Sequence, residues 1–397
     1  MLRFLTAGES HGPALVAIVE GLPAGLEITV EHFATELARR RLGYGRGPRM
    51  RLEKDELRIL GGVRHGRTLG GPVAVEIANT EWETRWKEEM SPHPGGVRRP
   101  LTRPRPGHAD LAGMQKYRLD DARDVLERAS ARETAARVVV GTLAKRLLAS
   151  IDVAVVSHVI QIGSVRSQSA RRPRPSDQEA VDSSPVRCFD EEAAEAMVRE
   201  IERAEGDGDS LGGVVEVLAY GVPVGLGSHV HWDRRLDAAL AGALMSIQAV
   251  KYVEIGEGAE IVGMRGSAAH DPIEWDDDAG GYRRRSHRAG GIEGGMSTGD
   301  LLVARVGMKP LATLRRPVLP TVDVHTKEES VSFKERTDVT AVPAMGVVAE
   351  AMVAWVLACE ASRKFGGDST EEFVRNYRSW EADLRERGQS VAREGGP

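Results

Sequence analysis

Two histidines in glycine-containing turns are the first candidates for chemistry. His11 stands in the motif GESHG, and His108 follows the proline-stiffened segment RPRPG. An imidazole donates or accepts a proton near neutral pH, and glycine lets a ligand approach the backbone closely. A single histidine in a loop is more often structural or solvated. A catalytic interpretation therefore requires an anion-binding group nearby.

Arginines in the segment 39–51 supply such a group, because six of its thirteen residues are arginines. The first three end a predicted helix, where cations are favourable through the helix dipole alone. Arg46 and Arg49 lie beyond that helix on a loop with several glycines. Guanidinium groups bind carboxylates and phosphates through two parallel hydrogen bonds, so we predict an anion-binding loop. Nucleic-acid phosphate is the rival ligand, although only Tyr44 could stack on a base.

Further cations stand later in the chain. Arg128 and Arg132 are four residues apart in a predicted helix that continues to Leu148, so we expect both on one face, with small residues between them. The second half of the chain adds three further features. They are a glycine-rich loop at 286–299, a Lys-Pro segment at 308–313, and an arginine with a carboxylate at 336–338. The residues alone indicate an enzyme for a small, multiply anionic substrate and a phosphorylated cofactor.

The overall composition excludes several classes of protein. A chain of 397 residues, 41% of them hydrophobic, is neither a disulfide-stabilised mini-protein nor a disordered tail. Its net charge of -5 lacks the basic excess of a non-specific nucleic-acid binder. The 54 basic residues comprise nine lysines and 45 arginines. Codon bias explains most of that excess, so position along the chain must identify the functional arginines.

Several common sites are not encoded. No glycine is followed by lysine, which excludes a P-loop, and the GxGxxG fingerprint of dinucleotide-binding folds is also missing. His229, His231 and Asp233 are close in sequence but have no obvious further ligand, so we expect no metal site. The two cysteines, Cys188 and Cys359, have no CxxC spacing, and the N-terminus lacks the apolar region of a signal peptide. We therefore expect a cytoplasmic protein.

The elements that must position these residues follow a repeated pattern. Residues 14–26 and 213–226 each form a β-rich run that ends in GxPxGL, and a helix-like segment follows each run, at 30–41 and 234–250. A second, weaker similarity relates the glycine-rich segment after residue 61 to the one after residue 290, although glycine-rich turns can also match by chance. The repeat predicts one domain, 1–386, with two pseudo-symmetric halves at about 1–160 and 190–386.

Three other segments complete the predicted organisation. Residues 164–185 are polar and rich in proline, which is typical of an exposed connection, and residues 387–397 are expected to form a flexible tail. The most apolar stretch, 341–359, has Glu350 at its middle. A carboxylate is costly in lipid, so we predict a buried helix there rather than a membrane span.

Motifs along nearly the whole chain, up to about residue 367, resemble those of the chorismate synthase family. In order they are GESHG at 8–12, RRRLGYGRG at 39–47, TLGGP at 68–72, RPRPGHAD at 103–110, RASARETAAR at 128–137, DSLGG at 209–213, IQAVK at 247–251, RAGGIEGGMSTG at 288–299, MKP at 308–310 and RTDVTAVPA at 336–344. The resemblance implies an α+β fold, a sandwich with helices between antiparallel sheets. It also implies a homotetramer.

The activity that the resemblance implies is a phosphate-eliminating carbon–oxygen lyase of the shikimate pathway. It would convert 5-enolpyruvylshikimate 3-phosphate into chorismate by an anti 1,4-elimination, with reduced flavin mononucleotide (FMN) and no net redox change. His11 would protonate the departing phosphate, His108 would protonate or orient the flavin, and Asp338 would assist removal of the ring proton.

The resemblance also assigns binding residues. The substrate would be held by Ser10, Arg40, Arg46, Arg49 and Arg132. The flavin would be held by Arg128, Ala129, Ser130, Gln248, Ala249, Gly295, Lys309, Pro310, Leu311, Ala312, Thr313 and Arg336. The family's Lys-Pro-Ile-Ser-Thr block reads KPLAT here, so Ala312 replaces a serine that could touch the flavin phosphate.

Two other functions stay open from the sequence. One is a flavin oxidoreductase, or a bifunctional enzyme with added NADPH:FMN reductase activity. The other is a nucleic-acid-binding protein that uses the arginines of 39–51, against which the net charge of -5 argues. We expect a small anionic substrate as the partner, with neither a nucleic acid nor a membrane.

Overall fold

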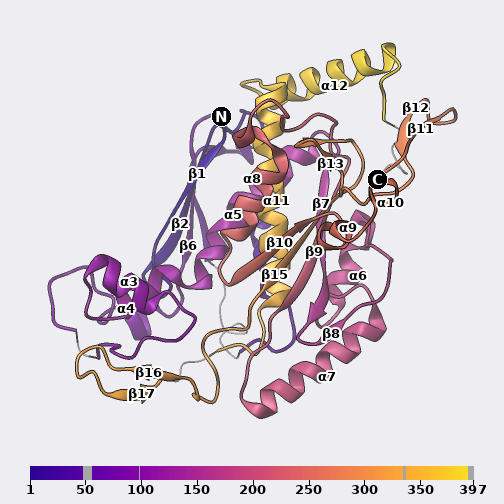
Figure 1. Cartoon of the computed structure of the whole chain (residues 1–397). Helices are drawn as coiled ribbons and strands as arrows, with labels where there is room; N and C mark the ends of the chain where they lie inside the picture. The colour runs from indigo at the N-terminus through magenta and orange to yellow at the C-terminus, as the bar shows by residue number, and fades with distance from the viewer. Residues whose placement is uncertain (48–55, 98, 334–336, 392–397) are drawn as a thin grey trace.

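Two antiparallel sheets enclose a layer of helices (Figure 1). The computed structural model describes residues 1–47, 56–97, 99–333 and 337–391. The first sheet has the order β1-β2-β6-β3, formed by β1 (Arg3–Ala7), β2 (Ala14–Glu20), β3 (Glu56–Gly61) and β6 (Val73–Ala78). The second has the order β10-β15-β9-β7-β8, formed by β7 (Ala154–Ile162), β8 (Val165–Arg166), β9 (Gly213–Tyr220), β10 (Val250–Ile255) and β15 (Leu302–Met308). This architecture confirms the predicted α+β sandwich.

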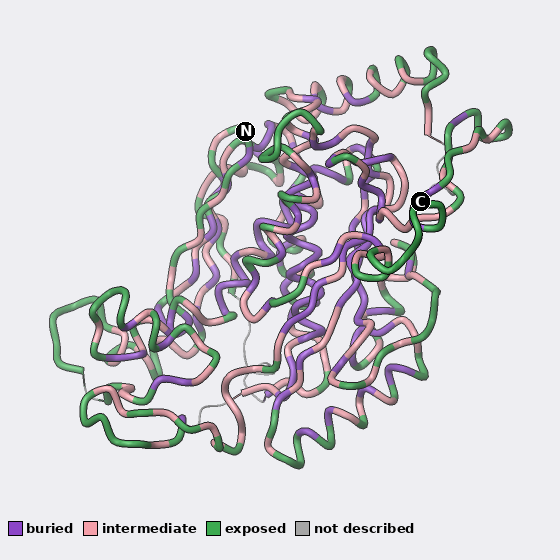
Figure 2. Tube along the Cα trace, in the orientation of Figure 1, coloured by how far each residue is buried: buried purple, intermediate pink, exposed green. Residues whose placement is uncertain are grey.

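The central layer consists of four helices. Its members are α1 (Val30–Arg41), α5 (Thr134–Ala149), α8 (Leu236–Met245) and α11 (Val342–Phe365). Of these, α5 and α11 bury most of their residues. Helices α5 and α11 cross closely at Gly141, where an added Cβ would lie 2.2 Å from the Cβ of Ala351. Helix α11 is long and apolar enough to cross a membrane, but 94% of its most apolar stretch of 18 residues is buried inside the protein (Figure 2). It is a core helix, as predicted.

The remaining elements surround this core. They are β4 (Val63–Arg64), β5 (Arg67–Thr68), the π-helical turn η1 (Trp82–Trp86), α3 (Asp110–Tyr117), α4 (Arg123–Ala129), the 3-10 turns η2 (Ala131–Glu133), η3 (Pro175–Asp177) and η4 (Trp232–Arg234), α6 (Gln178–Ser183), α7 (Glu191–Asp207), α9 (Gly258–Val262), α10 (Gly266–Ala269), β11 (Ile273–Asp276), β12 (Gly281–Arg284), β13 (Ile292–Glu293), β14 (Met296–Ser297), β16 (Pro320–Val322), β17 (Glu329–Val331) and α12 (Thr370–Glu386).

The same turn contacts occur in both halves of the chain. The Thr68 hydroxyl accepts a hydrogen bond from the amide of Leu26 (2.9 Å) and donates one to the carbonyl of Pro23 (2.6 Å). The Ser297 hydroxyl makes the equivalent bonds at 2.8 and 2.6 Å, with the amide of residue 226 and the carbonyl of residue 223. Ser297 is therefore the counterpart of Thr68 in the second half.

The strand orders repeat as well. Strands β1-β2-β6-β3 of the first sheet correspond to β7-β9-β15-β10 of the second. Strand β7 begins at Ala154 and pairs with β9, so the second sheet starts before residue 160. These repeated contacts support the division into two pseudo-symmetric halves, which stays a prediction.

The predicted helix from Arg128 to Leu148 is wrong in one respect, because the chain turns sharply at Ser130. That residue is extended, with φ -60° and ψ 140°, and its hydroxyl accepts a hydrogen bond from the amide of Arg132. Helix α4 therefore ends at Ala129, and α5 starts only at Thr134. As a result, Arg128 and Arg132 do not share a helix face.

One other boundary differs from the sequence prediction, and two further segments can be described in more detail. Helix α8 covers only part of 234–250, because the chain enters β10 at Val250. The predicted connection 164–185 is mostly exposed or half-buried and includes helix α6. In the predicted tail, the carbonyl of Ser390 accepts a hydrogen bond from the amide of Tyr282 (2.8 Å). The tail therefore lies beside strand β12 as far as Val391.

Candidate active site

One cavity of about 590 Å³ brings together most of the predicted site residues. Four parts of the chain meet at this cavity. They are the end of α1, the turn between α4 and α5, the end of β15 and the start of α11. Of the predicted residues, its lining includes Ser10, His11, Arg40, Arg46, His108, Ala129, Ser130, Arg132, Gln248, Ala249, Lys309, Leu311, Ala312, Thr313 and Asp338. This volume is typical of a small-molecule site.

Five predicted residues are not among this lining. Arg128 instead donates hydrogen bonds to the carbonyls of Gly8 (3.1 Å) and Thr6 (2.8 Å). Pro310 is exposed beside the lining residue Lys309. Gly295 lies in the turn between β13 and β14, against Arg235. Arg49 and Arg336 fall outside the described residues. A flavin contact for Arg128, Pro310 and Gly295 stays a prediction.

His11 is held in the cavity wall by a buried carboxylate. Its Nδ1 lies 2.9 Å from Glu127 Oε1. Its backbone amide also donates to Glu127 Oε2, at 2.8 Å. Beside it, the hydroxyl of Ser130 donates to that of Ser10 at 3.2 Å. Glu127 could not be predicted from the sequence, since a glutamate in a charged helix is usually solvated.

His108 has a similar arrangement with a different partner. Its Nδ1 makes a short contact with Asp110, whose side chain is fully buried. Arg105 binds the same carboxylate through Nε (2.9 Å) and Nη2 (3.1 Å). Burial alone would raise the pKa of Asp110, but the hydrogen bonds from His108 and Arg105 hold it well below its usual value. Asp110 therefore stays ionised and keeps His108 in one orientation.

The cavity is lined by cations that are themselves buried. Arg40 donates from Nε to the hydroxyl of Thr134 and from Nη2 to the carbonyl of Ala131, both at 3.0 Å. Arg46 forms an ion pair with Asp338 (3.1 Å). Asp338 also accepts a hydrogen bond from the amide of Gly47 (2.6 Å). These contacts fix the guanidinium groups before any ligand binds, which favours tight recognition of an anion.

A second wall combines Gln248 with the segment 308–313. The Gln248 amide donates from Nε2 to Glu133 (3.0 Å), while its buried Oε1 has no hydrogen-bond partner among the described residues. Ala249 has a φ of 66°, which an L-residue rarely adopts and which often marks a functional site. Across from it, the hydroxyl of Thr313 accepts a hydrogen bond from Arg105 (3.0 Å). This wall offers a bound group an acceptor at Gln248.

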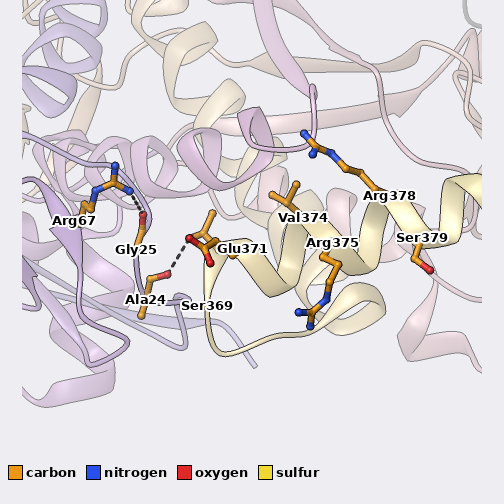
Figure 3. Close-up of a pocket in the computed structure, with 10 residues that line it drawn as sticks. Ala24, Gly25, Arg67, Ser369, Glu371, Val374, Arg375, Arg378 and Ser379 are labelled. Carbon is orange, nitrogen blue, oxygen red and sulfur yellow. Dashed lines mark hydrogen bonds between the residues drawn. The ribbon is translucent and has the colours of Figure 1, made fainter.

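A second hollow, of about 920 Å³, lies on the surface at the start of α12 (Figure 3). Arg67, Arg375 and Arg378 line it, and all three are exposed. The first amides of α12 already have partners, because Ser369 and Glu372 form a capping box. Neither a histidine nor any of the predicted catalytic residues lines this hollow. The predicted catalytic residues His11, His108 and Asp338 line the smaller cavity.

Comparison with known proteins gives the family. The family model for chorismate synthase matches residues 2–361. The chain belongs to the chorismate synthase family. A chorismate synthase from Thermobifida fusca is 61% identical over 390 residues, which cover 96% of this chain and 98% of that protein. One from Streptomyces coelicolor is 60% identical over 388 residues, with 96% and 98% covered.

A solved structure agrees with this assignment. A crystal structure of a chorismate synthase matches with a TM-score of 0.78 at 39% identity, covering 97% of this chain and 98% of that one. The predicted function is therefore confirmed: the chain is a carbon–oxygen lyase that forms chorismate from a small anionic substrate. Neither the flavin oxidoreductase nor the nucleic-acid-binding alternative finds support in these chorismate synthase matches.

Proposed function

We propose that this cavity holds 5-enolpyruvylshikimate 3-phosphate together with reduced FMN and that its residues promote the anti 1,4-elimination of phosphate. The observation that carries the proposal is the convergence of two histidines and five cations on one cavity. The cations are Arg40, Arg46, Arg105, Arg132 and Lys309. A substrate with two carboxylates and a phosphate needs such a set of donors, and apolar residues such as Met345 and Val348 line the same cavity.

The arginines bind and orient the substrate in this proposal. Arg40 and Arg132 are 5% and 8% exposed, so little water competes with a bound anion at either. Each guanidinium offers several donors in one plane, which matches a carboxylate or phosphate better than lysine does. Arg49 is proposed to add a further contact, although it lies outside the described residues.

Three side chains are proposed to serve the proton transfers. His11 donates a proton to the departing phosphate, since its ring lines the cavity and its Nδ1 is already held by Glu127. Asp338 assists removal of the ring proton, and its contacts with Arg46 and Gly47 keep the carboxylate in place. His108, held by Asp110, orients or protonates the flavin.

The wall that contains Gln248 fits a flavin. The buried Oε1 of Gln248 can accept a hydrogen bond from a ring N–H, while Lys309 and Thr313 can face a phosphate. Ala312 removes one hydroxyl from this segment, but Thr313 beside Arg105 keeps another. When bound, reduced FMN supplies electron density that stabilises positive charge on the substrate as phosphate leaves.

Replacing Gln248 with leucine is expected to weaken the binding of reduced FMN about fivefold, because one buried hydrogen bond contributes roughly 1 kcal/mol. Anaerobic titration of the flavin spectrum measures the Kd. Gln161→Leu is the matched control, since that amide donates to the carbonyl of Gly163 and does not line the cavity. An unchanged Kd in Gln248→Leu would remove Gln248 from the flavin site.

The function itself is tested by coupled binding. Reduced FMN is titrated anaerobically into the protein with and without 5-enolpyruvylshikimate 3-phosphate. We expect the substrate to tighten flavin binding and to change the flavin spectrum, because both occupy one cavity. If the flavin Kd and spectrum are the same with and without the substrate, the two ligands occupy separate sites and the proposal is overturned.

A homotetramer is proposed as the working assembly. The outer face of the first sheet carries exposed apolar side chains, among them Leu5 (72% exposed), Ile18 (41%) and Leu60 (55%). Leu5 pairs with Ile18 across neighbouring strands, which pairs in turn with Ala74. A continuous apolar row of this kind favours contact with another copy of the chain.

Leu5→Glu is expected to reduce the assembly to smaller species, because a buried interface does not tolerate an unpaired carboxylate. Light scattering after size exclusion measures the mass against the 43.0 kDa chain. The control is Leu111→Glu, which changes an exposed leucine of α3. A wild-type protein that runs as a monomer would contradict the proposed assembly.

A cytoplasmic location is also proposed. Both described cysteines are without a disulfide, which suits a reducing compartment. Burial raises the pKa of Cys188 to about 11 and that of Cys359 to about 12, so neither thiol is readily ionised.

A further inference from the structure

We propose that Glu127 is a positioning residue for His11, and that it works together with Trp86. The two side chains would fix the imidazole so that the reacting nitrogen is Nε2. This inference rests on the role proposed above for His11 and names the groups that make it possible.

Glu127 is joined to the 10–11 segment at several points. Both carboxylate oxygens lie near His11 Nδ1, at 2.9 and 3.0 Å. Oε2 also accepts a hydrogen bond from the amide of His11 (2.8 Å), and the Glu127 carbonyl accepts one from the amide of Ser10 (2.9 Å). The Glu127 side chain is 1% exposed and that of His11 is 10% exposed. Water therefore competes little with these bonds.

The charge around Glu127 keeps it ionised. Arg123 lies one helical turn earlier and places Nη1 3.2 Å from Glu127 Oε1. Burial alone would raise the pKa of Glu127, but the hydrogen bonds from His11 and the charge of Arg123 hold it below its usual value. An ionised carboxylate only accepts hydrogen bonds, so His11 Nδ1 must carry a proton. Proton transfer to a ligand then occurs at Nε2.

Trp86 packs against the face of the same imidazole. The two ring centroids are 3.9 Å apart, with an angle of 33° between the planes. The Arg123 guanidinium lies 5.2 Å from the centroid of Trp86, so one arginine contacts both groups that hold His11. The turn η1, whose role the sequence does not reveal, thus covers the histidine. With one face stacked and Nδ1 bonded, the ring has little freedom to rotate.

The other cavity histidine is held differently. Asp110 binds two nitrogens of Arg105 besides His108, whereas Glu127 places both oxygens near His11 Nδ1 and only one near Arg123. The orientation of His11 therefore depends on its carboxylate more directly than the orientation of His108 depends on Asp110. Removing the charge of Glu127 should act on His11 and on Arg123, so the test needs a control that changes another partner of Arg123.

The test compares Glu127→Gln with wild type in the full-length protein. We expect kcat for anaerobic phosphate release to fall about 10- to 100-fold, as for outer residues that orient a metal-bound histidine, with KM changed less than about threefold. Glu89→Gln is the matched control, because Glu89 lies 4.0 Å from the same Arg123 and has no described contact with His11. That control should keep wild-type kcat.

A second readout does not depend on turnover. Trp86 fluorescence, obtained by subtracting the spectrum of Trp86→Phe, reports the stacked imidazole directly. Glu127→Gln should change this component, and Glu89→Gln should not. If wild type fails to release phosphate but the fluorescence changes as expected, the catalytic role of His11 fails while its positioning by Glu127 stands.

A double-mutant cycle decides between positioning and a merely structural role. In a His11→Ala background, Glu127→Gln should have no further effect on kcat, because its target is gone. Additive losses would overturn the proposal, as would an unchanged kcat in a folded Glu127→Gln protein. If Glu127→Gln does not fold, Glu127→Asp replaces it in the same cycle, since it keeps the charge but withdraws the oxygens from Nδ1.

Discussion

His11→Ala is expected to lower kcat for phosphate release about 100- to 10,000-fold, the usual range for loss of a general acid. Without the imidazole, the departing phosphate must take its proton from water. The substrate KM should change little, because the anion is held by arginines that the substitution does not touch. Anaerobic assays with photoreduced FMN measure both constants.

His231→Ala provides the matched control for this substitution. His231 Nδ1 also lies 2.9 Å from a carboxylate, that of Asp233, but both side chains are more than half exposed and lie outside the cavity lining. Its kcat should equal that of wild type. A His11→Ala enzyme with undiminished kcat would show that the departing phosphate obtains its proton from another group.

Glu350→Gln is expected to lower the free energy of unfolding by about 3–5 kcal/mol, the cost of breaking a buried ion pair by removing one partner. Glu350 is 0% exposed in the middle of α11. It lies 2.8 Å from Arg39, 2.7 Å from Lys145 and 3.2 Å from Arg187. The substitution leaves these three cations with less negative charge in the core.

Urea unfolding compares this variant with Glu83→Gln. Glu83 pairs with Lys87 at 2.8 Å, but both side chains are mostly exposed, so its loss should cost less than about 1 kcal/mol. Equal midpoints for the two variants would mean that the buried cluster contributes no more than a surface pair.

The Glu350 cluster also predicts a pH dependence. Burial alone would raise the pKa of Glu350, but the charges of Arg39, Lys145 and Arg187 hold it well below its usual value. A carboxylate with a lowered folded-state pKa stabilises the protein above its unfolded pKa, about 4.3 for glutamate, and this stabilisation is lost as the pH falls further. Acid should therefore destabilise wild type more steeply than Glu350→Gln.

Local patterns were sufficient to predict much of the fold. The helical period of residues 30–41 predicted α1 with its observed bounds, and the apolar run with Glu350 at its middle predicted a buried helix, now α11. The GxPxGL repeat indicated two similar sheets, because the same turn chemistry recurs at Thr68 and Ser297. These signals are short-range, so they do not depend on knowing the fold.

Contacts between distant segments could not be predicted in this way. Arg39 and Arg40 are neighbours in a run of arginines, yet Arg39 enters the core to bind Glu350 while Arg40 lines the cavity. Their directions depend on where α11 and α5 pack against α1. Glu127 and Trp86 were missed for the same reason, since only the folded chain brings them to His11.

The family resemblance supplied most of the site. Residues alone indicated anion binding near His11, but the motifs identified which arginines and which segments converge. The break at Ser130 was missed because the run of small residues around it is compatible with a continuous helix. Its extended conformation moves Arg128 out of the cavity and leaves Arg132 in it.

The central claim is that one cavity eliminates phosphate with the aid of reduced FMN and without net oxidation. The most direct measurement follows phosphate, chorismate absorbance and the flavin spectrum together during anaerobic turnover of 5-enolpyruvylshikimate 3-phosphate. We predict one phosphate for each chorismate over many turnovers, with the flavin still reduced at the end. Absence of phosphate release, or oxidation of one flavin for each substrate consumed, would contradict the account.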